Sequence, residues 1–259
     1  MTLSDVKCFL LDMDGTFYLG GQLIEGSLAF IDRVLATGRD FLFLTNNSSH
    51  NASFYVQKLG KMGLSIDRSR VLTSGEATCA KLRQLYPGKR AFVLGNEYLL
   101  EEFREAGIPV DMAHPEIVVI GFDTTPDYNK MQDVCDFVRA GLPYVATHPD
   151  FNCPTETGFM PDIGAIMAFI EASTGRRPDL IVGKPNTGIV EAALKRTGLQ
   201  VGELAMVGDR LYTDIETGRR SGMLSILVMS GETTEEMLAA SPTQPDLKFG
   251  RLSDMIPLL

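Results

Sequence analysis

Short apolar runs recur along the chain and alternate with segments that have helical spacing. The runs are apolar throughout, which is typical of strands buried on both faces of a sheet. Parallel strands connected by helices are buried in this way, so the pattern predicts an α/β protein. The expected strands are Val6–Leu11, Phe41–Thr45, Val71–Thr73, Ala91–Leu94, Ile117–Phe122, Tyr144–Ala146, Leu180–Val182, Leu204–Val207 and Ser225–Val228.

The segments between these runs show the spacing of amphipathic helices. After the first strand, Leu28, Ile31, Val34 and Leu35 fall on one helical face, and Gly38 follows as a stop signal. Three later segments repeat the scheme and also end in glycine: KMQDVCDFVRAG, TGIVEAALKRTG and DIETGRRSG. Each lies between two expected strands, as the crossover helices of a parallel sheet do.

The residues with candidate chemistry gather in the first 50 positions and again after residue 180. The region between, roughly 79–180, has strand and helix patterns of its own but few candidate catalytic groups. This distribution predicts a second domain inserted into the first.

Charge and composition narrow the classes of function. The chain has 24 Lys+Arg against 33 Asp+Glu, a formal charge of −9. This argues against binding to nucleic acid or to an anionic membrane, but not against a phosphorylated substrate, because a bound metal can reverse the local field. No apolar run approaches the roughly 18–20 residues of a membrane helix. The start has no basic region of a signal peptide, and four dispersed cysteines fit buried thiols, so we expect a cytoplasmic protein.

Asp12 and Asp14 form the strongest local signal, because both directly follow the first strand in FLLDMDGT. Ligands of an open parallel sheet gather at the carboxyl ends of its strands. Two acids there repel each other unless a cation joins them, and carboxylate oxygens are ligands that Mg²⁺ prefers. The alternative is that the segment only turns the chain, since Asp and Gly are common turn residues.

Polar residues also follow three other strands. Thr45 and Asn46 end the second strand, where their donors could cradle an oxyanion or simply cap a helix. Lys184, between Gly183 and Pro185, could neutralise a phosphoryl group or be an ordinary solvated charge.

The fourth strand end carries two acids within GDRLYTD. Asp209 could supply an oxygen ligand to a metal, and Asp214 could orient the loop or a metal-bound water. A turn followed by a helix cap is the alternative, and it fits Asp214 better than Asp209.

In order and identity, these residues resemble the four motifs of the haloacid dehalogenase (HAD) superfamily: DMDGT, the threonine after the second strand, the lysine of GKP, and GDRLYTD. TNNSS, ATHPDFNCPTETGFMPDIGAI and VGKPN narrow the resemblance to the NagD-like, or p-nitrophenylphosphatase, branch, called subfamily IIA. His148 departs from the ATNxD pattern of that branch, in which asparagine is expected. The resemblance implies a Rossmann-like parallel sheet core of the HAD type at 1–78 and 181–259, with an inserted α/β (C2-type) cap domain at 79–180.

The resemblance also implies the role of each residue. Asp12 would be the nucleophile that forms an aspartyl-phosphate, and Asp14 the general acid and base. Mg²⁺ would be held by the carboxylates of Asp12 and Asp209 and the backbone carbonyl of Asp14. Thr45, Asn46 and Lys184 would bind the phosphoryl oxygens, with Asp214 behind the metal ligands.

The implied function is Mg²⁺-dependent hydrolysis of small phosphomonoesters, such as nucleoside monophosphates, sugar phosphates and p-nitrophenyl phosphate. A phosphomutase and a non-catalytic metabolite sensor on the same fold are the alternatives. A mutase is disfavoured because FYLGGQLIE is too short to hold a cap after the first motif, and a sensor because Asp12, Asp14 and Lys184 are all present. Dehalogenases lack an acid at the position of Asp14. Relatives assemble through the cap, so a homo-oligomer formed through the cap is a further expectation.

Overall fold

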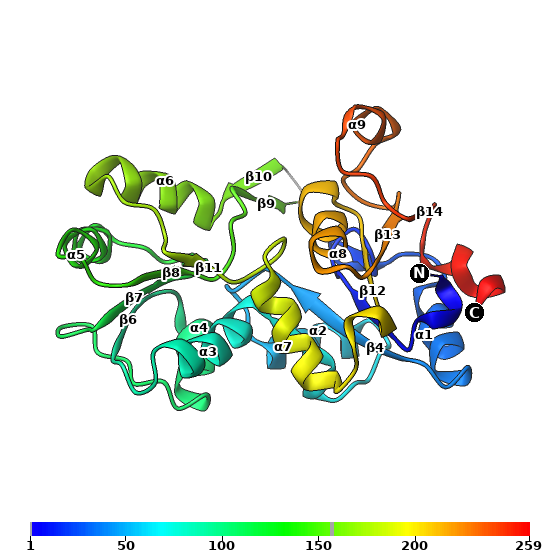
Figure 1. Cartoon of the computed structure of the whole chain (residues 1–259), viewed down its shortest axis with the longest axis horizontal. Helices are drawn as coiled ribbons and strands as arrows, with labels where there is room; N and C mark the ends of the chain where they lie inside the picture. The colour runs from blue at the N-terminus through cyan, green and yellow to red at the C-terminus, as the bar shows by residue number, and fades with distance from the viewer. Residues whose placement is uncertain (1, 156–157) are drawn as a thin grey trace. The chain divides into compact units, whose positions relative to one another are not determined.

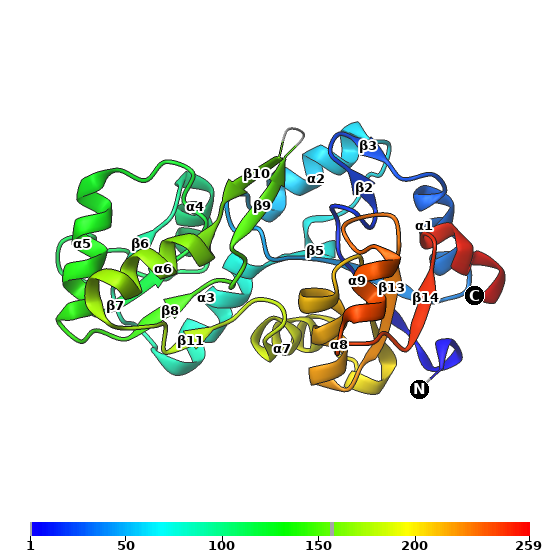
Figure 2. The same ribbon diagram turned by 90° about the horizontal axis from the view of Figure 1, so that it is seen from above.

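The computed structural model describes residues 2–155 and 158–259, which divide into two compact units. The core unit comprises Met1–Thr45, Tyr55–Leu72 and Lys184–Leu259. The inserted unit comprises Asn46–Phe54 and Thr73–Gly183, and the segment 79–180 lies within it. Each unit contains a sheet flanked by helices (Figures 1 and 2).

The core unit is built on a six-stranded sheet. The neighbours from β14 to β4 pair in parallel. β1 lies inside the sheet, where Leu10 is paired with Met206 on one side and Leu42 on the other. In order across the sheet, the strands are β14 (Leu247–Phe249), β13 (Leu224–Val228), β12 (Leu204–Gly208), β1 (Cys8–Leu11), β4 (Asp40–Thr45) and β5 (Val71–Thr73).

Aromatic side chains fill the core around β1 and β4. Phe9 of β1 meets the ring of Phe30 edge-on, with 5.6 Å between ring centroids. Phe43 of β4 meets Phe17 in the same way at 5.0 Å. All four rings are fully buried, and such edge-to-face pairs add to the free energy gained from apolar burial. The central strands are therefore a rigid base for the residues that follow them.

The helices that the core unit contains or shares are α1 (Ser27–Ala36), α2 (Ala52–Lys61), α7 (Thr187–Thr197), α8 (Glu216–Ser221) and α9 (Glu235–Ala240). A π-helical turn, Leu211–Ile215, precedes α8. Gly38, Gly198 and Gly222 follow their helices with positive φ, as the stop signals predict. Leu35, on the apolar face expected for α1, is 44% exposed, because α1 turns Phe30, Ile31 and Val34 inward.

The inserted unit has a smaller parallel sheet, ordered β11 (Leu180–Ile181), β8 (Tyr144–Ala146), β7 (Ile117–Ile120), β6 (Ala91–Leu94). Two helices pack together on one face, and the other two pack together on the opposite face (Figure 1). The first pair is α5 (Tyr128–Arg139) and α6 (Ile163–Thr174), and the second is α3 (Ser74–Leu85) and α4 (Glu97–Glu105).

All nine strands expected from the sequence are present, with ends shifted by two residues at most. Among the described residues, the strands that the sequence did not reveal are β14 and those of two antiparallel hairpins. One hairpin is β2 (Tyr18–Leu19) with β3 (Gln22–Leu23), and the other is β9 (Asn152–Thr155) with β10 (Gly158–Pro161). The strands of the second hairpin are mostly exposed and contain proline, so they lack a continuous apolar run.

Among the described residues, no helix is long and apolar enough to cross a membrane. Cys8, Cys79 and Cys135 are buried thiols, as the sequence predicts, while Cys153 is half-buried. Burial is the main cause that raises the pKa of the Cys8 thiol, to about 12, so this thiol stays protonated.

Glu216 ties α8 to the chain before β14. Its carboxylate accepts hydrogen bonds from Arg219 at 2.8 and 2.7 Å, Arg220 at 2.7 Å and Thr243 at 3.0 Å. These bonds, led by the one from Arg219, hold the pKa of Glu216 near 2, against the effect of burial. The native pKa lies below the unfolded value, so the ionised group stabilises the fold above pH ~4.5 and loses this effect as pH falls toward 2.

We therefore expect Glu216→Gln to lower the free energy of unfolding by about 1–2 kcal/mol at pH 7. The difference from the unsubstituted protein should shrink as pH falls below about 4.5, which urea unfolding followed by circular dichroism will measure. Asp32→Asn, at an exposed acid of α1, is the matched control. An equal loss at pH 7 and at pH 3.5 would contradict this account of Glu216.

Candidate active site

Three of the predicted site residues stand where neighbouring strands of the core sheet end. Asp12 directly follows β1, Asp209 directly follows β12, and Thr45 is the last residue of β4. β12, β1 and β4 are adjacent and parallel, so these residues lie along one edge of the sheet. The peptide N–H of Asp12 donates to the carbonyl of Val207 at 2.9 Å, which extends the β1–β12 pairing to the first catalytic candidate.

Two glycines make room for the carboxylate of Asp209. A Cβ built on Gly15 or on Gly231 would clash with that carboxylate, and Gly15 has φ +82°. The peptide N–H of Glu232 donates to Asp209 Oδ2 at 2.7 Å, and the Thr16 hydroxyl lies 3.5 Å from Oδ1. Gly15 of DMDGT therefore lets the backbone lie close to Asp209 of the last motif, in addition to turning the chain.

Lys184 lies between two of the acids. Its Nζ is 2.5 Å from Asp12 Oδ1, 2.6 Å from Asp214 Oδ1 and 3.2 Å from the carbonyl oxygen of Leu44. The lysine and Asp214 side chains are almost completely buried, at 3% and 1% exposure. Burial alone would lower the pKa of Lys184. The charges of Asp12 and Asp214 raise it by a larger amount, so its pKa is above the usual value and the amine is charged.

The acids around this lysine have raised pKa values, and burial is the main cause. Burial raises the pKa of Asp12 to about 6, with Lys184 opposing the rise and Asp214 adding to it. Burial, followed by the charges of Asp12 and Asp214, raises the pKa of Asp209 to about 8. Desolvation also raises the pKa of Asp14, against the charges of Lys58 and Arg210. A group of acids with raised pKa values favours a further cation.

The arrangement fits a divalent metal ion. Oxygens of Asp12, Asp209 and Asp214 all lie within 4.8 Å of one another, and carboxylate oxygens suit Mg²⁺, Ca²⁺ or Mn²⁺. Asp214 is already engaged, because it accepts from Lys184 and, at 3.2 Å, from the peptide N–H of Arg210. With both of its oxygens engaged, Asp214 anchors the lysine.

Two positively charged side chains near these acids, those of Arg210 and Lys58, were not identified from the sequence. Arg210 is mostly buried, its Nε lies 2.9 Å from Glu232 Oε2, and its charge lowers the pKa of both Asp12 and Asp14. Its place beside Asp209 in GDRLYTD was the available signal. Lys58 lies 3.9 Å from the centre of the Tyr18 ring and lowers the pKa of Asp14. A lysine on an amphipathic helix such as α2 carries no signal of its own.

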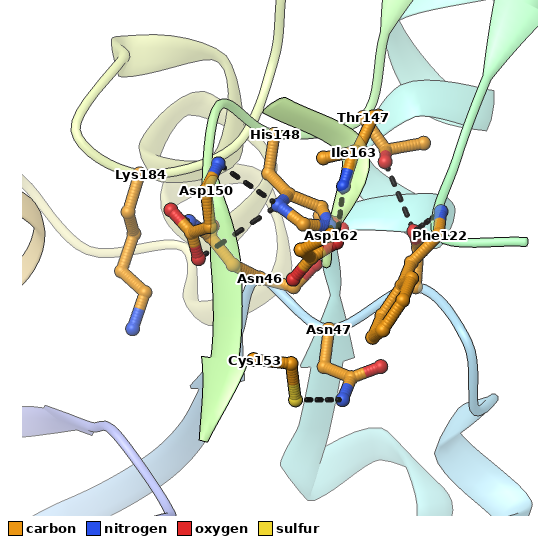
Figure 3. A network of polar contacts seen from close by, with 12 residues as sticks. Asn46, Asn47, Phe122, Thr147, His148, Asp150, Cys153, Asp162, Ile163 and Lys184 are labelled. Carbon is orange, nitrogen blue, oxygen red and sulfur yellow. Dashed lines mark hydrogen bonds and ion pairs between the residues drawn. The ribbon is translucent and has the colours of Figure 1, made fainter. Parts of the chain in front are cut away.

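Asn46 belongs to the inserted unit, and its side chain is engaged there. Its amide nitrogen lies 3.2 Å from both carboxylate oxygens of Asp150 (Figure 3). Its carbonyl accepts the hydroxyl of Ser74. The structure thus brings Asp12, Lys184, Asp209 and Asp214 close together in the core unit and places Thr45 on the same sheet edge. Within the inserted unit, the side chain of Asn46 contacts Asp150.

Comparison with known proteins shows the family of this chain. Residues 9–109 match the family model described as haloacid dehalogenase-like hydrolase, and residues 181–255 match a second HAD-hydrolase-like model. The acid sugar phosphatase of Staphylococcus aureus (strain MRSA252) is 36% identical over 255 residues, with 98% of each chain covered.

Solved structures agree over nearly the whole chain. The 4-nitrophenylphosphatase of Thermotoga maritima superposes with a TM-score of 0.96 at 45% identity, covering 98% of each chain. NagD of Escherichia coli superposes with a TM-score of 0.89 at 30% identity, covering 96% of this chain and 98% of that one. The chain therefore belongs to the haloacid dehalogenase-like hydrolases, in the NagD-like branch of subfamily IIA, and is a phosphoric monoester hydrolase with an inserted α/β cap domain.

Proposed function

We propose that this protein hydrolyses phosphomonoesters of small metabolites with the help of Mg²⁺, through an aspartyl-phosphate formed on Asp12. The observation that carries the proposal is the contact of Lys184 with Asp12 and Asp214, beside Asp209, at the carboxyl ends of adjacent parallel strands. This group combines a candidate nucleophile, a fixed cation and carboxylates that suit a metal.

In the first step, a carboxylate oxygen of Asp12 attacks phosphorus and the bond to the leaving oxygen breaks. The carboxylate must be ionised to attack, and the charge of Lys184 at 2.5 Å favours that form. The same lysine, fixed by Asp214 on its other side, would attract the phosphoryl oxygens as negative charge builds on them. Asp214 is therefore proposed to position Lys184.

Asp14 is proposed to move the proton. It would protonate the leaving oxygen and then take a proton from the water that hydrolyses the aspartyl-phosphate. Its pKa is raised by desolvation, which enlarges the protonated fraction needed for the first step. Lys58 and Arg210 oppose that rise, so they also favour the ionised form that the second step requires.

The proposed metal ligands are the carboxylates of Asp12 and Asp209 and the backbone carbonyl of Asp14. When bound, Mg²⁺ would reduce the repulsion between the anionic carboxylate and the anionic phosphate. Thr45, at the end of β4, is proposed to donate its hydroxyl to a phosphoryl oxygen, together with Asn46 and Lys184.

Relatives support the substrate class. The names acid sugar phosphatase and 4-nitrophenylphosphatase suggest that this protein acts on sugar phosphates and on p-nitrophenyl phosphate, and we add nucleoside monophosphates. We propose that the cap, within residues 79–180, contributes substrate selectivity, and that two or more copies assemble through it. A phosphomutase would retain the same core residues but protect the aspartyl-phosphate from water, and a sensor would bind phosphate esters without hydrolysing them.

Replacing Asp12 by Asn should abolish phosphate release from p-nitrophenyl phosphate, because the amide lacks the anionic oxygen that attacks phosphorus. The fold should persist, since the two side chains have nearly the same shape. Phosphate release and a thermal melting curve will be measured on the same preparation, with Asp32→Asn as the control for loss of one acidic charge. Turnover retained by a normally folded Asp12→Asn protein would rule out this nucleophile.

Magnesium should raise the melting temperature of the unsubstituted protein and permit turnover of a panel of sugar phosphates, nucleoside monophosphates and p-nitrophenyl phosphate. A chelator should reverse both effects. Asp209→Asn should lose the response of the melting temperature to Mg²⁺. Without metal, however, it should melt a few degrees higher than the unsubstituted protein, because burial, and after it the charges of Asp12 and Asp214, makes an ionisable acid unfavourable at this position.

Different results would contradict the metal site and the hydrolysis of phosphate esters. An undiminished response of Asp209→Asn to Mg²⁺ would place the metal elsewhere. Mg²⁺ binding without phosphate release from any ester would favour the sensor, and transfer of the phosphoryl group to a second sugar hydroxyl would favour the mutase.

A further inference from the structure

The side chain of Asn46 is enclosed by groups of the inserted unit. Its amide nitrogen is 3.2 Å from both oxygens of Asp150, and the residue is 6% exposed. A Cβ added to Gly183 would come within 2.7 Å of Asn46 Oδ1, so the backbone there lies against the amide oxygen. The main-chain carbonyl of Asn46 accepts the Ser74 hydroxyl. Both the side chain and the main chain of Asn46 are thus held.

His148 is next to Asp150 in the inserted unit and is fully buried. Its Nδ1 is 3.7 Å from Asp150 Oδ2 and accepts the peptide N–H of Asp150 at 3.4 Å. Its Nε2 is 3.6 Å from Asp162 Oδ1. The imidazole ring therefore lies between two carboxylates, one facing each ring nitrogen (Figure 3).

The second acid beside His148, Asp162, lies at the start of a helix. Asp162 is the N-cap residue of α6, and its Oδ1 accepts the peptide N–H of Ile163 at 2.6 Å. Contacts therefore run from the start of α6 through Asp162, His148 and Asp150 to Asn46. The hydrogen bonds of Asp150 with Asn46 and of Asp162 with Ile163 hold the two acids, and the ring of His148 lies between them.

A metal ion is a poorer explanation of this cluster. The three side chains lie close enough to surround an ion, with candidate ligand atoms within 4.8 Å of one another. However, the two carboxylates face different nitrogens of the ring. The acids also have donors without an ion, because both oxygens of Asp150 lie 3.2 Å from the amide nitrogen of Asn46 and Asp162 Oδ1 accepts the peptide N–H of Ile163.

We propose that Asp150 and His148 are positioning residues for the phosphatase reaction, acting through Asn46. They hold the carboxamide of Asn46 against the inserted unit and thereby fix its main chain. This inference rests on the proposed function for Asn46. It also gives His148, which departs from the asparagine of the branch pattern, a role of its own: one ring spans two carboxylates.

The test is a double-mutant cycle on p-nitrophenyl phosphate and a sugar phosphate in the presence of Mg²⁺. Asp150→Ala should lower kcat/KM about tenfold or more, because a misplaced phosphate contact weakens catalysis. The factor should be the same for both esters, since they share only the phosphoryl group. Asn46→Ala should cause a similar loss, and adding Asp150→Ala to it should cause little further loss.

Two conservative variants test whether the losses come from unfolding. Asp150→Asn keeps one acceptor oxygen and should recover part of the activity that Asp150→Ala loses. His148→Asn should reduce kcat/KM less than His148→Leu, because asparagine can still donate to one carboxylate. His114→Asn, at an exposed histidine of the same unit, should leave kcat/KM unchanged, and melting curves of all variants will be compared.

Hydrogen exchange gives a readout that does not depend on turnover. Peptides covering residues 46–54 should exchange faster in Asp150→Ala and His148→Leu than in the unsubstituted protein or His114→Asn. Unchanged exchange in this segment would overturn the positioning role whether or not the protein is active. Additive losses in the cycle, or losses that differ between the two esters, would also overturn it, the latter by indicating direct contact with the leaving group. Faster exchange without any turnover of the unsubstituted protein would instead refute the proposed function while supporting the positioning of Asn46.

Discussion

The buried ion pairs of Lys184 with Asp12 and Asp214 are the constraint on which the candidate site depends. A lysine that is 3% exposed must have partners for its charge, and both partners are acids supplied by distant parts of the sequence. The pairs fix the position of the amine and favour the ionised form of Asp12. Burial and, after it, the charges of Asp12 and Asp214 raise the pKa of Asp209, and a divalent cation would favour its ionised form. One arrangement of charge thus supports both the proposed nucleophile and the proposed metal site.

Close packing around Asp209 makes that arrangement specific. Gly15 and Gly231 approach its carboxylate too closely for any side chain, and the peptide N–H of Glu232 binds it directly. The first and last motifs therefore depend on each other, although they are almost 200 residues apart in the sequence. A glycine that looks like a turn signal in DMDGT has a second function that only the folded chain reveals.

The sequence predicts the parallel strands and the acids at their ends because buried strands and strand-end chemistry leave local patterns. It does not predict that Asp214 pairs with Lys184, since that pairing depends on the turn Leu211–Ile215 and on burial. Lys58 is missed for a similar reason, because its position over Tyr18 depends on tertiary packing. Likewise, the contact between Asn46 and Asp150 joins residues 104 positions apart and has no local signature. Asp12, Asp14, Thr45, Lys184 and Asp209 could be named from the sequence, but their partners could not.

The central claim is that Asp12 carries the phosphoryl group during the reaction. The most direct measurement is rapid acid quenching of the enzyme during turnover with Mg²⁺, followed by mass spectrometry of its peptides. The account predicts a phosphorylated peptide that contains Asp12, present with substrate and Mg²⁺ and absent when a chelator is added. Steady turnover with no phosphorylated peptide, or with the phosphoryl group on another residue, would contradict it.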